Sequence, residues 1–291
     1  MRDDGTKRTQ HSSIRTRPQR PHAKKSLGQN FLVDESVIEK IVDELDPRTG
    51  ETIIEIGPGQ GALTSRLVES AGRIIAIEFD RDLVQDLHGQ FRHRDNFILI
   101  EDDALAVDVG VIIAPASTAR LIANLPYNMS TAILQRLLEQ REYLSELILM
   151  LQREVAGRIT APPSTSERGY LSVFVEAYAE VEKLFDVAPT AFRPVPKVWS
   201  TVVRLTPRPR ITLDVENEAL LWRLVSAGFA QRRKTIFNNL RNAHGLFPSG
   251  KIEETVLRLL ESSGIESRRR AESLSLEEWV RVSKALEVIS S

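Results

Sequence analysis

The tetrapeptide Asn124-Leu125-Pro126-Tyr127 places an amide, a proline and an aromatic ring where an apolar run, residues 120–124, ends. An exocyclic amino group on a nucleic-acid base is a poor nucleophile because its lone pair is delocalised into the ring. Acceptors for its two hydrogens, such as the side-chain oxygen of Asn124 and the carbonyl of Leu125 held by Pro126, favour the reactive pyramidal geometry. Tyr127 offers a face on which a base can stack. Taken alone, however, the tetrapeptide is more typical of a loop turn with a capping asparagine.

A glycine-rich stretch, EIGPGQGA at residues 55–62, follows an earlier apolar run. Gly57, Gly59 and Ala62 fit the spacing G-x-G-x-x-G/A of dinucleotide-binding loops, although a tight strand-to-helix turn would need similar glycines. Glu78 ends the next apolar run, where a carboxylate is suited to hydrogen bond both hydroxyls of a ribose. The pattern therefore predicts an adenosine-containing cofactor.

The residues around these glycines indicate which cofactor it is. Pro58 removes one main-chain donor from the loop, which suits a pyrophosphate less well. Glu55 would repel a pyrophosphate but would attract an ammonium group, directly or through water. S-adenosylmethionine carries an ammonium group and no phosphate, so it is the expected cofactor. Asp103, after the third apolar run, would accept from the adenine amino group or, alternatively, cap a helix.

The elements that must position these residues alternate between short apolar runs and helix-compatible segments. An amphipathic helix is expected over residues 36–45. Strands are expected over residues 52–56, 73–78, 96–101, 120–124 and 146–151. Short β-branched runs that alternate with helices predict an α/β protein with a parallel sheet covered on both faces.

The second half of the chain changes pattern twice. Two apolar stretches, residues 170–187 and 199–207, lack a clear helix between them and predict antiparallel strands at the end of the sheet. After TPRPR, residues 206–210, only helical patterns follow. We expect a basic tail over 1–24, a cofactor-binding domain over 25–208 and a small all-helical domain over 209–291.

Charge and composition separate the tail from the rest of the chain. Residues 1–26 hold eight Lys or Arg and two Asp, a net charge of +6, which leaves −7 for the remainder. The tail has too few apolar residues to offset the entropy of ordering and is expected to be disordered. A solubilising extension and an arm that grips RNA fit it equally well.

Other protein classes are excluded or disfavoured by composition. The chain has no cysteine, which excludes disulfides and cysteine-based metal sites or nucleophiles. It has no apolar run of membrane-spanning length and no secretory signal, so a cytoplasmic location is expected. Neither the five histidines nor the neighbouring Asp102 and Asp103 have the spacing of a metal site or a catalytic triad. We expect no metal and a monomer.

Eight strings in order along residues 24–285 together resemble the KsgA family of small-subunit ribosomal RNA adenine N6,N6-dimethyltransferases. The strings are KSLGQNFLVD (25–34), EIGPGQGALT (55–64), IEFDRDL (77–83), DDAL (102–105), NLPYNMST (124–131), AFRPVPKVWSTVVRL (191–205), FAQRRKTIFNNL (229–240) and RRAESLSLEEW (269–279). The resemblance implies a Rossmann-like class I methyltransferase sheet. It also implies two methyl transfers from S-adenosylmethionine to each of two adjacent adenosines near the 3′ end of small-subunit (16S) rRNA, and a checkpoint role in subunit maturation.

The resemblance carries roles onto individual residues. Asn30 and Leu32 would form a lid over the cofactor, and Gly57 would belong to the glycine loop. Glu78 would bind the ribose, and Asp103 would contact the adenine of the cofactor. Asn124 would contact both the cofactor and the target base, while Tyr127 and Phe192 would sandwich the flipped adenine. The chain has DDAL and NMST where the family usually has GDAL and NIST. Its tail is also longer than is typical, so the resemblance supports no role for the tail.

The stretch QRRKT predicts contacts with RNA. Arg232, Arg233 and Lys234 are expected on one helix, where they would contact phosphates in a pre-30S particle; a solvated basic face is the alternative. A related group that methylates large-subunit rRNA is a competing interpretation, which QRRKT and FRPVPKVWSTVVRL disfavour. An assembly factor whose binding matters more than its catalysis is another. A small-molecule methyltransferase would leave QRRKT without a purpose.

Overall fold

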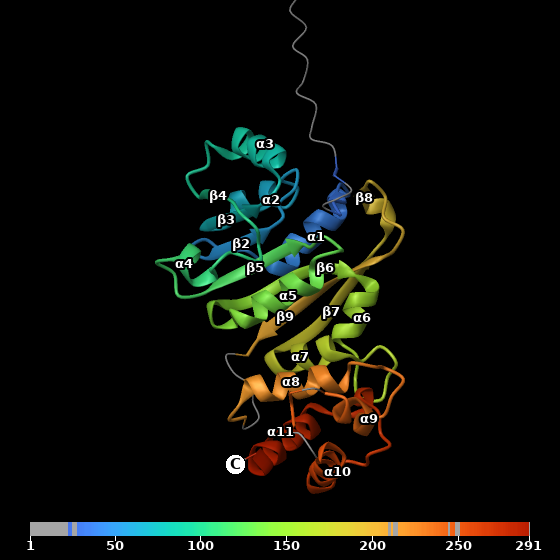
Figure 1. Ribbon diagram of the computed structural model, residues 1–291. Coiled ribbons are helices and arrows are strands. Elements are labelled where there is room, and N and C mark those ends of the chain that lie inside the picture. Colours follow the sequence, from blue (N-terminus) through green and yellow to red (C-terminus); the bar gives the residue numbers. More distant parts are fainter. Residues whose placement is uncertain are drawn as a thin grey trace, which may run out of the picture.

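The computed structural model describes residues 23–24, 28–208, 211, 215–243, 245–247 and 251–290. At its centre is a seven-stranded sheet of order β4-β3-β2-β5-β6-β9-β7 (Figure 1). Its strands are β2 (Thr52–Ile56), β3 (Arg73–Glu78), β4 (Phe97–Glu101), β5 (Ala119–Asn124), β6 (Leu144–Gln152), β7 (Ala179–Val187) and β9 (Ser200–Pro207). The strands from β4 to β6 are parallel, whereas β9 is antiparallel to both β6 and β7.

The central strands are apolar on both faces because helices cover both faces. In β2, Ile53 and Ile54 point to opposite sides and both are fully buried. One face packs against α1 (Glu35–Leu45), α2 (Thr64–Ser70) and α3 (Arg81–Phe91). The other packs against α4 (Val109–Ile113), α5 (Ser130–Glu139), α6 (Arg153–Ile159) and α7 (Tyr170–Tyr178).

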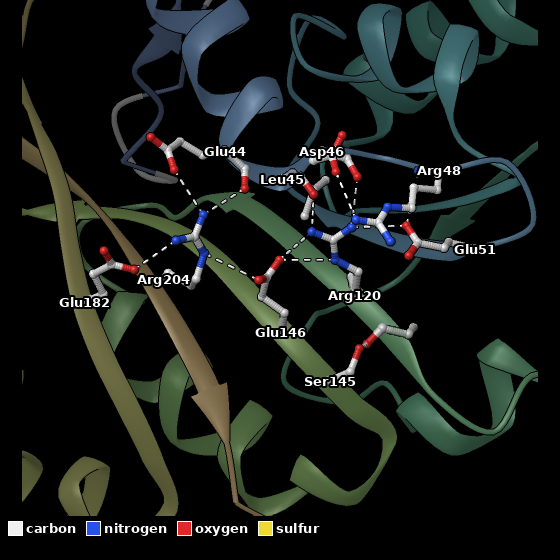
Figure 2. Close-up of polar contacts among 11 residues, drawn as sticks. Glu44, Leu45, Asp46, Arg48, Glu51, Arg120, Ser145, Glu146, Glu182 and Arg204 are labelled. Atoms are coloured by element: carbon white, nitrogen blue, oxygen red, sulfur yellow. Dashed lines mark hydrogen bonds and ion pairs between the residues drawn. The ribbon is translucent and has the colours of Figure 1, made fainter.

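Two arginines of the sheet fix the C-terminal end of α1 (Figure 2). Arg204 of β9 donates to the carbonyl and to the carboxylate of Glu44, at 2.9 and 3.0 Å, and Arg120 of β5 donates to the Leu45 carbonyl. Glu146 of β6 joins the two guanidinium groups, 2.6 Å from Arg120 Nη2 and 3.4 Å from Arg204 Nε. Cations at a helix C-terminus satisfy its last carbonyls and complement its dipole. The network therefore ties α1 to three strands.

A second, two-stranded sheet joins the segment before α1 to the segment before β9. It pairs β1 (Phe31–Leu32) with β8 (Phe192–Arg193) in antiparallel register, with Leu32 opposite Phe192. The Val33 amide extends the pairing by donating to the Ala191 carbonyl at 2.9 Å. The predicted cofactor lid and the segment with the predicted base-stacking Phe192 thus form one unit.

The C-terminal part is helical, as expected. It comprises α8 (Glu218–Gly228), α9 (Ile236–Arg241), α10 (Ile252–Ser262) and α11 (Leu276–Ser290), below the sheet in Figure 1. Its apolar residues belong to the same core cluster as one face of the sheet. Trp222 of α8 donates to the Tyr178 hydroxyl of α7 at 2.7 Å, which helps to join the two parts.

The expected strands over 52–56 and 73–78 coincide with β2 and β3, but one prediction for the second half is wrong. The stretch 170–187 is not a single strand, because its first half forms the helix α7 and only Ala179–Val187 is a strand. The expected boundary near residue 209 and residues 1–22 of the tail expected over 1–24 lie outside the described residues. None of the helices in the described part of the chain is long and apolar enough to cross a membrane.

Candidate cofactor and base site

A cavity opens at the carboxyl ends of β2, β3 and β5, the edge where parallel α/β sheets bind ligands. Eleven of the sequence-predicted site residues line it: Asn30, Leu32, Glu55, Gly57, Gly59, Glu78, Asp103, Asn124, Leu125, Pro126 and Tyr127. Four other predicted residues, Phe192, Arg232, Arg233 and Lys234, do not.

The glycine loop requires glycine for both conformation and space. Gly57 and Gly59 adopt φ angles of +65° and +59°, in the left-handed region that other residues rarely enter. A Cβ on Gly59 would lie 3.1 Å from the ring of Phe31 in β1. The strand β1 therefore packs directly on the loop, and the glycines of the loop line the cavity.

Glu78 is held in place by three main-chain amides. Its Oε1 accepts from Phe79 and Asp80 at 3.0 and 2.9 Å, and its Oε2 accepts from Gly59 at 3.2 Å. Burial raises the pKa of this carboxyl, while the amide hydrogen bonds act in the opposite direction. A carboxylate offers about four lone-pair sites, so the three amide bonds leave one, on Oε2, for a ribose hydroxyl. The carboxylate is thus oriented before any ligand arrives.

Glu55 lies at the floor of the cavity, only 1% exposed. Thr64 donates its hydroxyl to Oε2 at 2.7 Å. Burial raises the pKa of Glu55 to about 7, and the nearby charge of Glu78 contributes in the same direction. Because a bound cation would favour the ionised form, this carboxyl suits the ammonium group of S-adenosylmethionine and would oppose a pyrophosphate.

Asp103 does not cap a helix, because the next helix, α4, is capped by Asp108. The Oδ1 of Asp103 accepts from the Leu105 amide at 2.9 Å in the turn that follows β4. Its Oδ2 has no hydrogen-bond partner among the described residues, and Asp103 lines the cavity. One oxygen therefore fixes the turn, while the other is available to an adenine amino group.

The orientation of the Asn124 side chain follows from its partner. Asn124 Nδ2 donates to the main-chain carbonyl of Asn30 at 3.1 Å. A carbonyl can only accept, so the amide nitrogen must face Asn30 and the side-chain oxygen must face away from it. That oxygen is the acceptor which the base-amine hypothesis requires. The same bond links the end of β5 to the residue before β1.

A second acceptor lies beside it. The Leu125 amide donates to the Met150 carbonyl of β6 at 3.3 Å, and the Met129 amide returns to the Pro126 carbonyl at 3.1 Å. No donor among the described residues reaches the carbonyl oxygen of Leu125. The sequence predicted this carbonyl as the main-chain acceptor for the target amino group.

Tyr127 is half-buried and is tied to β9. Its hydroxyl is hydrogen-bonded to the hydroxyl of the buried Ser200 at 2.8 Å. Burial raises the pKa of Tyr127, so the phenol is neutral near pH 7. The ring lines the cavity, and its hydroxyl is held by Ser200.

The predicted sandwich of Tyr127 and Phe192 is not formed in this structure. Phe192 is fully buried in the core cluster with Leu32 and Ile122, and it does not line the cavity. The pairing of β1 with β8 places its side chain in this core, where it supports the lid strand. Of these two aromatic residues, only Tyr127 lines the cavity.

The predicted helical placement of Arg232, Arg233 and Lys234 is wrong. All three are exposed, but they lie in the turn between α8, which ends at Gly228, and α9, which begins at Ile236. Arg232 donates to the Ser166 carbonyl in the loop between α6 and α7. The basic residues nevertheless remain together on one turn.

Several residues that support the site were missed. Lys24 donates to Asp80 at 2.6 Å and Gln29 donates to the same carboxylate at 2.9 Å, which fastens the segment before the lid beside Glu78. Ser200 was missed because a lone serine carries no sequence signal. Asp80 could have been found as the N-cap of α3, two residues after Glu78.

The strand order, the glycine loop and Glu78 together define an α/β protein of the class I methyltransferase type, with a cavity suited to an adenosine cofactor. The family model for "Ribosomal RNA adenine dimethylase" matches residues 20–287. The chain belongs to this ribosomal RNA adenine dimethylase family. The predicted family, fold class, cofactor and enzyme class are thereby confirmed: an S-adenosylmethionine-dependent rRNA adenine dimethyltransferase.

Curated relatives and solved structures agree with this assignment. A "Ribosomal RNA small subunit methyltransferase A" from Bacillus pumilus is 40% identical over 91% of this chain and 91% of its own length. One of the same name from Saccharophagus degradans is 42% identical over 93% and 97%. The fold is similar to a dimethyladenosine transferase from Plasmodium falciparum, with a TM-score of 0.73, 23% identity and coverage of 87% and 95%. It is also similar to the 23S rRNA methyltransferase ErmE, with a TM-score of 0.64, 23% identity and coverage of 89% and 100%.

Proposed function

We propose that this protein transfers methyl groups from S-adenosylmethionine to the N6 amino groups of two adjacent adenosines near the 3′ end of small-subunit (16S) rRNA. The names of the curated relatives support the small subunit as the substrate. The observation that carries the chemistry is the orientation of Asn124, whose bond to Asn30 turns its side-chain oxygen away from the lid. That oxygen and the Leu125 carbonyl are two acceptors in the same segment as Tyr127, whose ring lines the cavity.

The residues of the chain act mainly by placing the target amino group. The Asn124 oxygen and the Leu125 carbonyl accept its two hydrogens, which turns the nitrogen lone pair out of the base plane. Tyr127 holds the flipped base by stacking on it. When bound, S-adenosylmethionine supplies a methyl group activated by its sulfonium. The two acceptors are worth most in the pyramidal geometry of the transition state, which is what acceleration of the chemical step requires.

No general base is needed in this mechanism. As the nitrogen lone pair forms its bond to the methyl carbon, the bond from that carbon to the sulfonium sulfur would break and leave a neutral thioether. The amine is then positively charged and acidic enough to lose a proton to water. The monomethylated nitrogen retains a lone pair and one hydrogen, so one of the two acceptors can hold it for the second transfer. The carboxyl groups of Glu78 and Glu55 are assigned to the cofactor.

The substrate is a pre-30S particle in the cytoplasm, and the enzyme acts as a monomer. Exposed Arg232, Arg233 and Lys234 contact phosphates of the rRNA. A role as an assembly checkpoint is compatible with this activity, because a bound methyltransferase excludes other factors from the same rRNA. The alternative of a large-subunit substrate has less support, since the curated relatives that match about nine-tenths of the chain are named for the small subunit.

Primer extension across the 3′ region of small-subunit rRNA, in cells with and without the gene, tests this function. Dimethylated adenines stop reverse transcription, so a strong stop at the 3′-side adenine of the pair should appear only with the gene. A plasmid-borne Glu78→Ala variant, in which binding of S-adenosylmethionine is impaired, serves as the control. It should restore a weaker stop than the wild-type gene. Stops that persist without the gene, or stops in large-subunit rRNA only, would reject the proposed substrate.

A further inference from the structure

The 193–199 loop, which runs from the last residue of β8 to the residue before β9, exposes an unusual concentration of apolar side chains. The described residues contain ten large exposed apolar side chains, and three of them, Val195, Val198 and Trp199, lie in this loop with exposures of 54%, 43% and 47%. Trp279 is fully buried and Trp222 is partly buried in the core. Trp199 is therefore the tryptophan that the described surface presents most fully.

The backbone of the loop is constrained, so the tryptophan is presented rather than loosely attached. The Arg153 amide at the start of α6 donates to the Trp199 carbonyl at 2.9 Å. Pro194 and Pro196 restrict the preceding main chain. An exposed aromatic residue on a restrained backbone loses little entropy when a ligand stacks on it.

The loop is also positively charged. It contains Arg193 and Lys197 and no acidic residue, and both side chains are exposed. Lys197 makes no ion pair with any described residue. Arg153 adds a third exposed cation, 3.6 Å from Asp186, the acidic group that faces it. An exposed aromatic ring surrounded by cations suits a nucleotide. The base can stack on the ring, and the negative phosphate is attracted by the cations.

The loop is continuous with the base site. Trp199 immediately precedes Ser200, so their Cα atoms are about 3.8 Å apart. Ser200 holds the Tyr127 hydroxyl, and it pairs with Gln152 where β6 ends, at the carboxyl edge of the sheet. In Figure 1 the segment leads from β8 to the start of β9 at that edge. A nucleotide next to the flipped adenine is thus within reach of Trp199.

We propose that the 193–199 loop is an RNA-contact surface, on which Trp199 stacks with an unpaired nucleotide that flanks the target adenine. The loop then fixes the strand on one side of the flipped base and contributes to the choice of target. This inference rests on the proposed function, because it requires an RNA substrate at the same cavity. It assigns no chemistry to Trp199.

Methylation kinetics on small-subunit particles from cells that lack the gene test this surface. Trp199→Ala should weaken particle binding and raise KM roughly 5- to 100-fold, the range expected when one base loses its stacking partner, with a smaller change in kcat. Trp199→Phe should stay within about 3-fold of the wild type, because a ring remains. Val111→Ala, a change at a 70% exposed apolar residue on α4, is the matched control and should have no effect. Affinity for S-adenosylmethionine should be unchanged in all three variants.

Three outcomes would overturn the proposal. The first is an unchanged KM in Trp199→Ala, and the second is an equal loss in Trp199→Phe and Trp199→Ala. The third is a loss of affinity for the particle without any loss for a fluorescent single-stranded RNA of the target sequence, which would mean that a ribosomal protein covers the loop. Failure of the wild-type enzyme to methylate the particle would instead reject the proposed function, so the two failures are distinguishable.

Discussion

The hydroxyl of Tyr127 lies 2.8 Å from the hydroxyl of Ser200 and joins the Asn-Leu-Pro-Tyr segment to the first residue of β9. The bond is sheltered, since Ser200 is fully buried. It fixes the direction of the Tyr127 ring from the end opposite to the main chain. Base placement therefore depends on a strand that is distant in sequence.

Ser200→Ala and Tyr127→Phe should have the same modest effect. A neutral hydrogen bond contributes about 0.5 to 1.5 kcal/mol, so each change should lower the single-turnover rate roughly 2- to 10-fold. If Ser200 acts only through the Tyr127 hydroxyl, the double variant should be no slower than either single variant. If the rate reductions of the two single variants multiply in the double variant, Ser200 has a role separate from the Tyr127 hydroxyl.

Glu78→Ala should weaken binding of S-adenosylmethionine by roughly 1.5 to 3 kcal/mol, the usual contribution of hydrogen bonds to a charged group. Titration calorimetry measures this directly. Glu101→Ala is a matched control, since Glu101 pairs with Glu78 in the neighbouring strand but its side chain is exposed. A folded Glu78→Ala protein with unchanged affinity would refute the ribose assignment.

Glu55→Gln should stabilise the free protein above neutral pH. The pKa of Glu55 is raised from 4.5 to about 7, so the folded state disfavours ionisation. The resulting loss in the free energy of unfolding is absent below pH 4.5, the pKa of the unfolded chain. It grows as the pH rises and is fully present above pH 7. Denaturant unfolding should show a gain of about 1 to 3 kcal/mol at pH 8 and almost none at pH 4.5. Glu39→Gln, on the surface of α1, should show no such trend.

The same substitution should weaken binding of the cationic cofactor. In the wild-type protein, affinity for S-adenosylmethionine should rise as the pH increases from 5 to 7, because a bound cation favours the ionised carboxyl and its binding releases a proton. In Glu55→Gln this pH dependence should be lost. A wild-type affinity that is flat over this range would show that Glu55 does not face the ammonium group.

Charge reversal at Arg233 and Lys234 should reduce the salt dependence of RNA binding. For each phosphate that is no longer neutralised, the slope of log affinity against log salt should fall by about 0.7 to 0.9. Arg48→Glu is the control, because Arg48 is exposed in the segment between α1 and β2. If the variants match the wild type in RNA affinity and in salt slope, Arg233 and Lys234 do not contact RNA and are only a solvated basic surface.

Much of the fold was predictable because the central strands are covered on both faces. Such strands appear as continuous β-branched runs, so residues 52–56 and 73–78 were correctly delimited. The helix α7 was mistaken for strand because it is apolar on nearly all sides and carries no helical periodicity. Chain order also placed Glu55, Glu78 and Asn124 at one edge, since parallel strands end on the same side.

The remaining features depend on contacts between distant segments. Phe192 was expected at the target base, but its pairing with Leu32 places it in the core. Arg232 and its neighbours were expected on a helix, whereas α9 begins only after Thr235, whose side chain caps it. The Ser200 bond and the orientation of Asn124 similarly arise from tertiary contacts that no local pattern encodes.

Single-turnover methylation of a small-subunit particle by Asn124 and Tyr127 variants tests the central claim most directly. Asn124→Ala should lower the rate by orders of magnitude with a smaller change in RNA affinity, because its oxygen matters most as the nitrogen becomes pyramidal. Tyr127→Ala should impair both base placement and turnover by about 1 to 3 kcal/mol, while Tyr127→Phe should remain within about 10-fold of the wild type. A Tyr127→Phe enzyme as inactive as Tyr127→Ala, or a fully active Asn124→Ala enzyme, would contradict the account.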